Sequence, residues 1–553
     1  MLRPQPLPPI PDDTARVARA AFRKGHPYLG LADHLGDLIT DALFAPLFPH
    51  RGQPALAPWR LALATILQFA EGLSDVQAAD AVRSRIDWKY LLRLDLTDAG
   101  FDASVLCEFR ARLVAGEAED LLLDTLLTWC REQGLLKARG KQRTDSTHVL
   151  AAIRALNRLE LVSEAMRHAL DSLAVAHPAW LRQRAAPEWA ERYARRAEDA
   201  RLPRSKEGRE ERALTIGRDG VALLTALRAD GVPAWLRELP AVETLRRVWV
   251  QNYQLADDTV RWRGAADIPP AATFISSPHD QDAHFAKKET TQWVGYKVHL
   301  TEACDDDQPR LIVHVATTTG PTADDAVTPR IHADLQRREL LPSTHIVDTG
   351  FLDAALLVSS KEEYGVELLG PTRHDYQWQA RERTGFAAEY FRIDWERQQA
   401  LCPQGHTSLS WTPTIGRKQG EVIRIKFSTK DCGPCPCRPL CCRSQKRSPR
   451  RTLSVRPQAD YVALHAARNH ERTEEFATAY ARRAGIEGTL SRGLRVCRLR
   501  RTRYTGQEHV HLGHVLTAVG LNFLRLGEWF SDAPRARMRR SPFATLIAGA
   551  PPT

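Results

Sequence analysis

The sequence predicts a mixed α/β fold, in which helices cover a central sheet and further segments are attached to it. Strand-like runs alternate with helical patterns between residues 141 and 372. The chain of 553 residues is too long for one hydrophobic core, so we expect about three or four domains. With 43% hydrophobic and 26% charged residues, the composition is that of a globular protein and excludes a wholly disordered chain.

The N-terminal part of the chain predicts helices after a short tail. Residues 1–25 begin with the proline-rich MLRPQPLPPIPDD and are expected to be extended. Residues 26–135 repeat apolar side chains at helical spacing, as at Trp59, Leu63 and Ile66. We therefore expect an all-α N-terminal domain over residues 26–135.

Two short helices of this domain meet at a tight turn. Gly72 ends one helical pattern, and Ser74 with Gln77 fits a capping box that starts the next. The outline over residues 58–83 is that of a helix–turn–helix, although a plain helical bundle explains the same pattern. One further helix is expected within residues 102–136.

Strand signals begin at residue 141 and return after a long helical interval. Residues 153–275 have few strand signals and are expected to form a helical insertion. A helix is also expected over residues 324–340. The strand-like runs are residues 141–151, 291–303, 309–319, 343–351 and 364–372.

The last part of the chain changes character three times. Residues 373–458 are irregular and rich in cysteine, and residues 459–531 become helical again. Residues 532–553 are basic and are expected to be disordered.

Charge and hydropathy restrict the partners. The formal net charge of +11 favours a polyanionic partner, such as DNA, RNA or an acidic membrane face. The chain has no apolar run of about 18 residues and no signal peptide. These features predict a cytoplasmic protein that does not span a membrane.

Six of the ten cysteines lie between Cys402 and Cys442, which suits a metal cluster in a reducing compartment. Cys432 and Cys435 form a C-x-x-C pair with the spacing that tetrahedral zinc requires. Cys402 and Cys441 are the natural remaining ligands. Neighbouring substitutes are Cys437, Cys442 and His406, and a cysteine-rich loop without metal is the alternative. Such a zinc ion would be structural.

Two aspartates stand in strand-like segments. Asp145 lies in KQRTDSTHVLA and Asp348 in STHIVDTGF. Buried carboxylates are unfavourable unless a positive group balances them, and Mg²⁺ prefers carboxylate oxygens. Each aspartate alone is better explained as a turn or helix cap.

A tyrosine, an arginine and a glutamate share one face of a helix expected over residues 473–495. Tyr480, Arg483 and Glu487 are spaced by three and four residues. This face suits a site where Glu487 completes a carboxylate cluster and the other two side chains contact phosphate. The alternative is a solvated face with an Arg483–Glu487 ion pair, which is the weaker orientation for such a pair.

Four blocks of the sequence resemble the DDE transposases of bacterial insertion sequences. The blocks are TDSTHV around Asp145, GYKVHLTE at residues 295–302, HIVDTGF around Asp348, and YARRAGIEGTLSRGLRVCRLRRTRYTG at residues 480–506. The resemblance covers roughly residues 26–531. It departs from the family at Leu494, where a lysine is often found, and Arg492 or Arg495 could supply that cation.

The resemblance implies a fold and a chemistry. A ribonuclease H-like mixed-sheet core would be built from residues 136–152, 276–372 and 459–531, with a zinc-ribbon-like segment at residues 373–458. Asp145, Asp348 and Glu487 would be the catalytic residues, and they would hold Mg²⁺ or Mn²⁺ for two-metal phosphoryl transfer. The reaction would cut the ends of the element and join its 3′-hydroxyl to target DNA.

Basic and aromatic residues near these motifs are expected to contact DNA. These residues are Lys297, Tyr480, Arg483, Arg492, Arg495, Arg501, Arg503 and Tyr504. The helix–turn–helix outline would read the terminal repeats with Arg83, Arg85 and Lys89.

The expected partners are double-stranded DNA, both terminal inverted repeats and target, and a second copy of the chain. Bringing two element ends together requires a homodimer or a larger synaptic complex. The alternatives are a non-catalytic DNA-binding regulator derived from a transposase, and a nuclease of the same fold without strand transfer.

Overall fold

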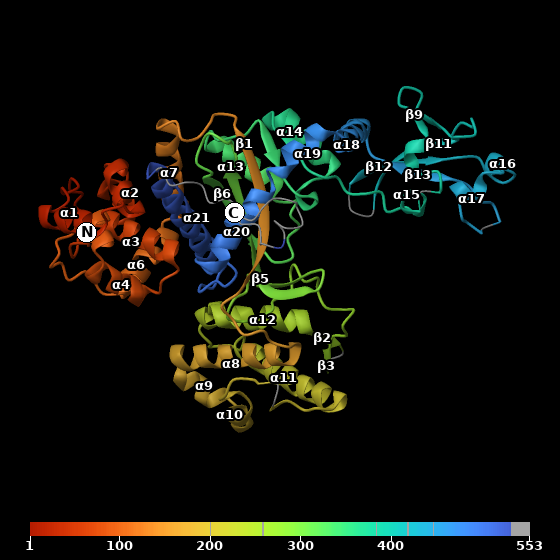
Figure 1. Ribbon diagram of the computed structural model, residues 1–553. Coiled ribbons are helices and arrows are strands. Elements are labelled where there is room, and N and C mark those ends of the chain that lie inside the picture. Colours follow the sequence, from red (N-terminus) through yellow and green to blue (C-terminus); the bar gives the residue numbers. More distant parts are fainter. Residues whose placement is uncertain are drawn as a thin grey trace.

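The computed structural model describes residues 1–198, 201–256, 259–382, 384–416, 420–445, 447–531 and 543. The basic tail expected at residues 532–553 therefore lies outside the described residues, except for Phe543. A mixed sheet stands at the centre of the molecule, with the N-terminal helices on one side and two further groups of elements projecting from it (Figure 1).

The central sheet has six strands in the order β4-β5-β1-β7-β8, with β6 also paired to β5. β5 pairs antiparallel with β1 and β6, whereas β1–β7 and β7–β8 are parallel. All five strand-like runs of the sequence contain a strand. The bounds are β1 (Lys141–Leu150), β4 (His284–Lys288), β5 (Thr291–Ala303), β6 (Ile312–Thr319), β7 (Thr344–Ile346) and β8 (Glu367–Leu369). β4 was not expected, because its histidine and two lysines hide the alternating pattern.

Helices cover both faces of this sheet. Consecutive side chains of a strand point to opposite faces, and β6 shows which helices lie on each. His314 Nε2 contacts Asp334 of α13, while the Thr317 hydroxyl contacts His514 of α21. One layer contains α13 (Thr328–Arg337) and α14 (Ala354–Tyr364), and the other contains α20 (Ala484–Arg495) and α21 (Gln507–Phe530).

The N-terminal helices share a hydrophobic core with the sheet. One cluster of buried side chains runs from Ile66 of α3 through Val515 of α21 to Val298 of β5. The elements are α1 (Asp12–Ala21), α2 (Pro27–Leu35), η1 (Asp41–Leu47), α3 (Pro58–Glu71), α4 (Asp75–Ser84), α5 (Ile86–Leu91), α6 (Ser104–Ala115) and α7 (Leu121–Glu132). The one helix expected over residues 102–136 is thus two helices, α6 and α7.

The local signals near residue 72 are confirmed. The Ser74 hydroxyl accepts the Gln77 amide at 3.2 Å, and the Gln77 side chain accepts the Ser74 amide at 2.9 Å. Gly72 ends α3 with φ of +67°, a left-handed conformation that favours glycine.

The prediction of an extended tail over residues 1–25 is wrong for residues 12–21, which form α1. The prolines end at Pro11, and Asp12 and Asp13 then stabilise the first turn of the helix. Burial of Ala18 against the N-terminal helices fixes α1 in place.

The residues between β1 and β4 form a mainly helical group with a core of its own. Its buried side chains, such as Leu161, Ile216 and Trp249, form a cluster separate from that of the sheet. The elements are α8 (Arg158–Ala176), α9 (Pro178–Arg184), α10 (Pro187–Tyr193), α11 (Lys206–Ala226), η3 (Ala234–Glu238), α12 (Pro240–Asn252), β2 (Tyr253–Ala256) and β3 (Thr259–Trp262). The short hairpin β2–β3 was not expected from the sequence.

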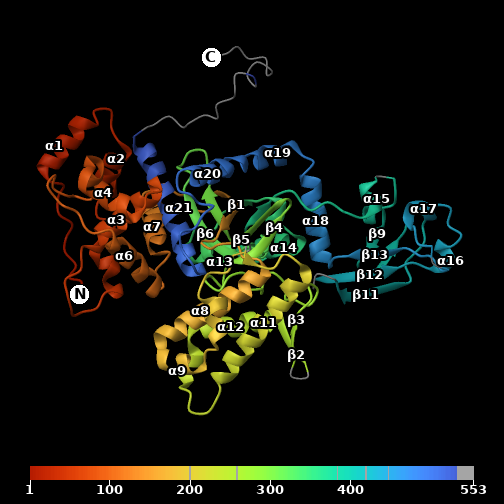
Figure 2. The same ribbon diagram turned by 90° about the horizontal axis from the view of Figure 1, so that it is seen from below.

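The cysteine-rich segment projects from the side of the sheet opposite to the N-terminal helices (Figure 2). Its small core centres on Phe391, Ile425 and Phe427. The elements are α15 (Trp378–Arg381), η5 (Ala388–Tyr390), β9 (Arg392–Asp394), β10 (Gln399–Leu401), β11 (Ser410–Ile415), β12 (Glu421–Lys426), α16 (Thr429–Cys432), α17 (Arg438–Cys441) and β13 (Thr452–Val455). α18 (Gln458–His470) then returns to the sheet and packs on α14.

Candidate active site

Asp145 lies on β1, and Asp348 lies directly after β7, the parallel strand next to β1. Arg143 of β1 pairs with Ile346 of β7, and each aspartate follows two residues later. Asp348 starts the short turn η4 (Thr349–Phe351), where its carboxylate accepts the Gly350 amide at 2.8 Å. The expected turn cap is thus present, and it fixes the orientation of the Asp348 carboxylate.

The helix expected over residues 473–495 is interrupted. α19 (Glu474–Ala481) ends before Arg482, and α20 begins at Ala484. The carbonyl of Arg482 accepts a hydrogen bond from the Arg143 guanidinium, and the Gly485 amide reaches Arg482 only in a tighter three-residue turn. The single continuous helical face is therefore wrong, although Arg483 still reaches Glu487.

One guanidinium contacts all three predicted acids. Arg483 Nη2 lies 2.9 Å from Asp145 Oδ2 and 3.8 Å from Asp348 Oδ2. Arg483 Nη1 lies 3.4 Å from Glu487 Oε1. The Arg483–Glu487 ion pair is therefore present, but as one part of a four-residue cluster. Side chains from three distant segments meet at this arginine.

Burial and charge oppose each other in the cluster. Burial raises the pKa of Asp145, the Arg483 guanidinium counteracts that rise, and the nearby Asp348 charge adds to it. Burial lowers the pKa of Arg483, but the acids, above all Asp145, outweigh this effect and raise the pKa. The side chain of Asp145 is 14% exposed and that of Glu487 is 66% exposed. Glu487 is therefore the acid most open to solvent.

Tyr480 stands beside the same cluster. Burial raises the pKa of its phenol, and the charges of Arg483, Asp348 and Asp145 all act on it. Tyr480 also stacks on Phe476, with 5.5 Å between the ring centroids. The tyrosine is therefore held next to the acids by packing.

Within the described ranges, no group of three or more His, Cys, Asp or Glu side chains is arranged to hold a metal ion as the side chains stand. At the three acids, the Arg483 guanidinium lies in contact with every carboxylate.

A fourth carboxylate near Asp348 was missed by sequence reasoning. A Cβ placed on Gly350 would lie 3.0 Å from Asp348 Oδ1 and 3.2 Å from Asp324 Oδ2. Asp324 Oδ1 is 3.0 Å from Lys297 Nζ, and Lys297 also donates to the Thr322 carbonyl at 2.7 Å. The Lys297 ammonium is therefore already paired inside the protein, and its contact with DNA stays a prediction. The adjacent aspartates of PTADDAV were the available signal.

The predicted DNA-contact residues beyond Glu487 divide into two groups. Tyr504 has a buried hydroxyl, and its ring packs against Gly513 and Arg110, so its expected contact with DNA stays a prediction. The arginines lie nearer the surface. Arg492 pairs with Glu528 at 3.1 Å, Arg495 bonds to the Ser491 carbonyl at 3.4 Å, Arg503 donates to the Leu73 carbonyl at 2.9 Å, and Arg501 is exposed.

The cations expected to contact DNA from the helix–turn–helix outline are engaged in contacts within the protein. Lys89 is 3% exposed and donates to the carbonyls of Asp95 and Asp98. Arg85 pairs with Glu71 and Asp87. Burial therefore contradicts the contact expected of Lys89, whereas that of Arg85, whose side chain is 35% exposed, stays a prediction. Arg83 remains on the surface of α4, paired with Asp80 at 2.7 Å.

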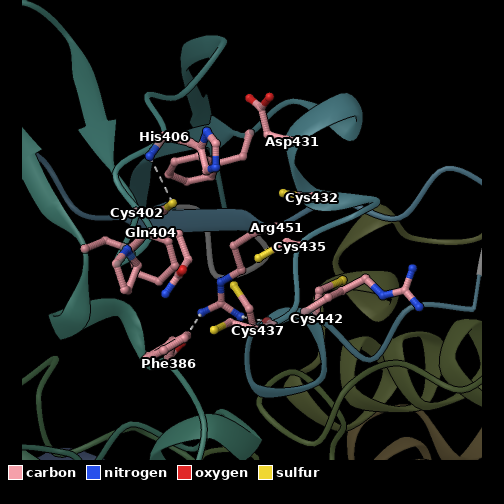
Figure 3. A pocket seen from close by; sticks show the side chains of 15 residues that line it. Phe386, Cys402, Gln404, His406, Asp431, Cys432, Cys435, Cys437, Cys442 and Arg451 are labelled. Carbon is pink, nitrogen blue, oxygen red and sulfur yellow. Dashed lines mark hydrogen bonds between the residues drawn. The ribbon is translucent and has the colours of Figure 1, made fainter.

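The six clustered cysteines and His406 line one pocket (Figure 3). Cys402 Sγ accepts the His406 amide at 3.4 Å, whereas Cys442 Sγ donates to the Arg450 carbonyl at 3.3 Å. Burial raises the pKa of Cys441 to about 11. The buried Arg451 guanidinium crosses the pocket and donates to the Cys441 carbonyl at 2.9 Å.

Two family models match this chain. One, described as a transposase DDE domain, matches residues 401–527. The other, described as a transposase domain of the DUF772 type, matches residues 16–112. These two matches support a DDE transposase of the insertion-sequence type.

The match to the transposase DDE domain covers Glu487, Arg483 and the cysteine cluster, while Asp145 and Asp348 lie outside both matches. A comparison with curated proteins gave no match. No helix in the described part of this chain is long and apolar enough to cross a lipid bilayer.

Proposed function

We propose that the protein cuts the ends of its own insertion sequence and joins the freed 3′-hydroxyl to target DNA. The observation that carries the proposal is the meeting of Asp145, Asp348 and Glu487 around Arg483. Three acids gathered from distant segments beside a tyrosine are expected at a phosphoryl-transfer site and serve no purpose in a binding module.

The strand order supports a ribonuclease H-like core. An antiparallel trio, β6-β5-β1, continues into the parallel strands β7 and β8. The proposed acids stand on β1, directly after β7, and on the helix that covers β1. Together with this core we propose the domain boundaries expected from the sequence. They include an N-terminal DNA-binding part and a helical insertion.

The chemistry of the acids fits Mg²⁺ or Mn²⁺, because carboxylate oxygens are the ligands that both ions prefer. Asp145, Asp348 and Glu487 would hold the metal, which when bound activates the attacking oxygen and stabilises the leaving oxygen of a phosphodiester. The Gly350 amide keeps the Asp348 carboxylate oriented. Arg483 and Tyr480 would bind the phosphate next to the acids.

The cysteine pocket is proposed to hold a structural zinc through Cys402, Cys432, Cys435 and Cys441. A thiolate accepts hydrogen bonds, and Cys402 accepts a backbone amide. Cys442 instead donates to the Arg450 carbonyl, so we propose that it lies outside the ligand set.

The zinc proposal predicts different results for neighbouring cysteines. Cys432→Ser is expected to lose zinc from the purified protein, whereas Cys442→Ser keeps it, because only Cys432 is a ligand. Metal analysis of both variants and of the wild type measures this. Equal zinc loss in both variants would contradict the assignment of Cys442, and a wild type without zinc would end the proposal.

Surface arginines and self-association are proposed to bring the protein together with DNA. The exposed Arg501 and the surface arginines Arg492, Arg495 and Arg503 would contact DNA beside α20. Joining two element ends requires a homodimer or a larger complex on DNA. Access to the chromosome supports the cytoplasmic location expected from the sequence.

The test is cleavage and joining of a duplex taken from the DNA that flanks the coding region, in Mg²⁺ or Mn²⁺. Alanine at Asp145, Asp348 or Glu487 is expected to abolish both steps while the protein still binds the duplex. Arg204→Ala, a surface change in the insertion, is the control. Full cleavage by any acid variant would remove that residue from the site.

The same assay separates the alternative functions. A wild type that cuts but never joins would be a nuclease without strand transfer. A wild type that binds the duplex tightly and never nicks it would be a DNA-binding regulator.

A further inference from the structure

A buried ion pair joins the two central strands beneath α20. Arg143 of β1 and Glu302 of β5 are register partners. The side chains of Arg143 and Glu302 are 4% and 0% exposed. Arg143 Nε and Nη2 lie 2.7 and 2.6 Å from Glu302 Oε1. A two-pronged contact of this kind fixes the guanidinium plane.

The other oxygen of Glu302 bonds to the helical layer. Glu302 Oε2 accepts the Thr489 hydroxyl of α20 at 2.5 Å and Arg525 Nη1 of α21 at 3.0 Å. Arg525 also donates to the Thr489 hydroxyl. One buried carboxylate therefore ties β1, β5, α20 and α21 together.

Arg143 also contacts the beginning of α20 directly. Its guanidinium donates to the Arg482 carbonyl. A Cβ on Gly485 would lie 2.1 Å from Arg143 Nη1, which is closer than atoms can approach. Only glycine at position 485 lets the guanidinium lie against the helix. Arg143 precedes Asp145 by two residues, and Gly485 precedes Glu487 by two residues.

We propose that Arg143 and Glu302 are positioning residues that hold α20 on the sheet, so that Glu487 stands at Asp145. The inference rests on the proposed function, since it explains how two of its acids are kept in register. Arg143 touches neither acid and acts through α20. Displacing its guanidinium would leave Glu302 with one cation fewer and free the first turn of the helix.

Two glycines of α20 provide a matched test. Gly485→Ala places a methyl group against Arg143, whereas Gly488→Ala meets nothing within 4 Å. Both changes add the same helix propensity, because alanine is favoured over glycine within a helix. We expect Gly485→Ala to lower the single-turnover cleavage rate at saturating duplex by roughly 100-fold, the size expected for a misplaced catalytic group. The Gly488→Ala rate should equal the wild type, and DNA affinity should be unchanged in both.

A double-mutant cycle distinguishes positioning from general damage. In an Arg143→Gln background, Gly485→Ala should cause no further loss of rate, because the group that it displaces is gone. A loss in Gly485→Ala equal to that in Gly488→Ala, or full additivity with Arg143→Gln, would overturn the proposal.

A second measurement keeps the two proposals separable. Amide hydrogen exchange of residues 484–495 should be faster in Gly485→Ala than in Gly488→Ala, whether or not the wild type cleaves DNA. A wild type without cleavage would reject the proposed function alone. Equal exchange in the two variants would reject the positioning role alone.

Discussion

At the scale of single residues, Arg483 decides the electrostatics of the site. Its side chain is 15% exposed, and its guanidinium contacts the three acids at 2.9, 3.4 and 3.8 Å. Without it, the half-buried acids would repel each other, and the ionised form of Asp145 would be still less favourable. The arginine therefore offsets part of the rise in the pKa of Asp145 that burial and the nearby Asp348 charge cause.

The pKa of Asp145 predicts how stability changes in Asp145→Asn. Burial raises this pKa above that of the unfolded chain. The folded state therefore binds the proton more tightly, and this contribution to stability is present at low pH and is lost as pH rises through the folded pKa. Asp145→Asn should unfold at a higher temperature than the wild type at pH 7, with the difference shrinking towards pH 3. Thermal unfolding at both pH values measures it.

The control for this prediction is Glu487→Gln, since Glu487 is largely exposed. It should change the unfolding temperature little at either pH. A wild type more stable than Asp145→Asn at pH 7 would mean that the Arg483 ion pair outweighs the burial of the carboxylate.

At the scale of elements, the end of α3 meets the turn that follows α20. A Cβ on Gly72 would lie 2.1 Å from the Val496 carbonyl oxygen, and the φ of Gly72 is +67°. Gly134 has φ of +69°, and a Cβ there would meet nothing within 4 Å. The two glycines therefore share a backbone strain and differ in one contact.

Gly134→Ala should cost about 1 kcal/mol of unfolding free energy, from the left-handed conformation alone. Gly72→Ala should cost more, on the order of 3 kcal/mol or above, because α3 must also move away from the backbone at Val496. Urea unfolding of both variants measures the difference. Equal losses would show that this joint between α3 and α20 yields without penalty.

The elements also show what sequence could and could not predict. The capping box at Ser74 and the strand of Asp145 were predictable, because both depend on neighbouring residues. The break between α19 and α20 was not, since the Arg482 carbonyl is taken by Arg143, a residue far away in the sequence. Lys89 and Lys297 were expected at DNA for their charge, yet folding buries both cations against carbonyls and, for Lys297, a carboxylate.

In the site as well, some features could be predicted from the sequence and others could not. The motifs around Asp145, Asp348 and Glu487 singled out these acids, but only the parallel pairing of β1 with β7 brings the two aspartates side by side. Asp324 and Glu302 have no distinctive local pattern. Their importance arises from contacts that only the folded chain makes.

At the scale of the whole molecule, the attached groups differ in how they join the sheet. The N-terminal helices share one hydrophobic cluster with α21 and the strands. The group between β1 and β4 has a separate cluster. Removing the N-terminal helices should expose the hydrophobic core of the sheet, whereas removing the group between β1 and β4 should not.

Two deletions test this difference. A chain without residues 1–135 should lose cooperative thermal unfolding, because the α21 surface that packs on α3 becomes exposed. Replacing residues 153–275 with a short Gly/Ser linker should keep a cooperative transition, since the strand ends that it joins both flank β5. Circular dichroism and limited proteolysis of the two proteins measure this. A folded N-terminal deletion would show that the shared cluster is dispensable.

The position of Arg483 has a further consequence for the order of events on DNA. A guanidinium that turns towards a phosphate releases the acids that it had neutralised. Binding of DNA would then leave the three carboxylates without their positive partner, at the step where a divalent ion is required. By reciprocity, the ion would favour the state in which the arginine is free to hold the nucleic acid. Binding of DNA would thus raise the affinity of the site for the ion, and binding of the ion would raise its affinity for DNA. The site would need both ligands to act.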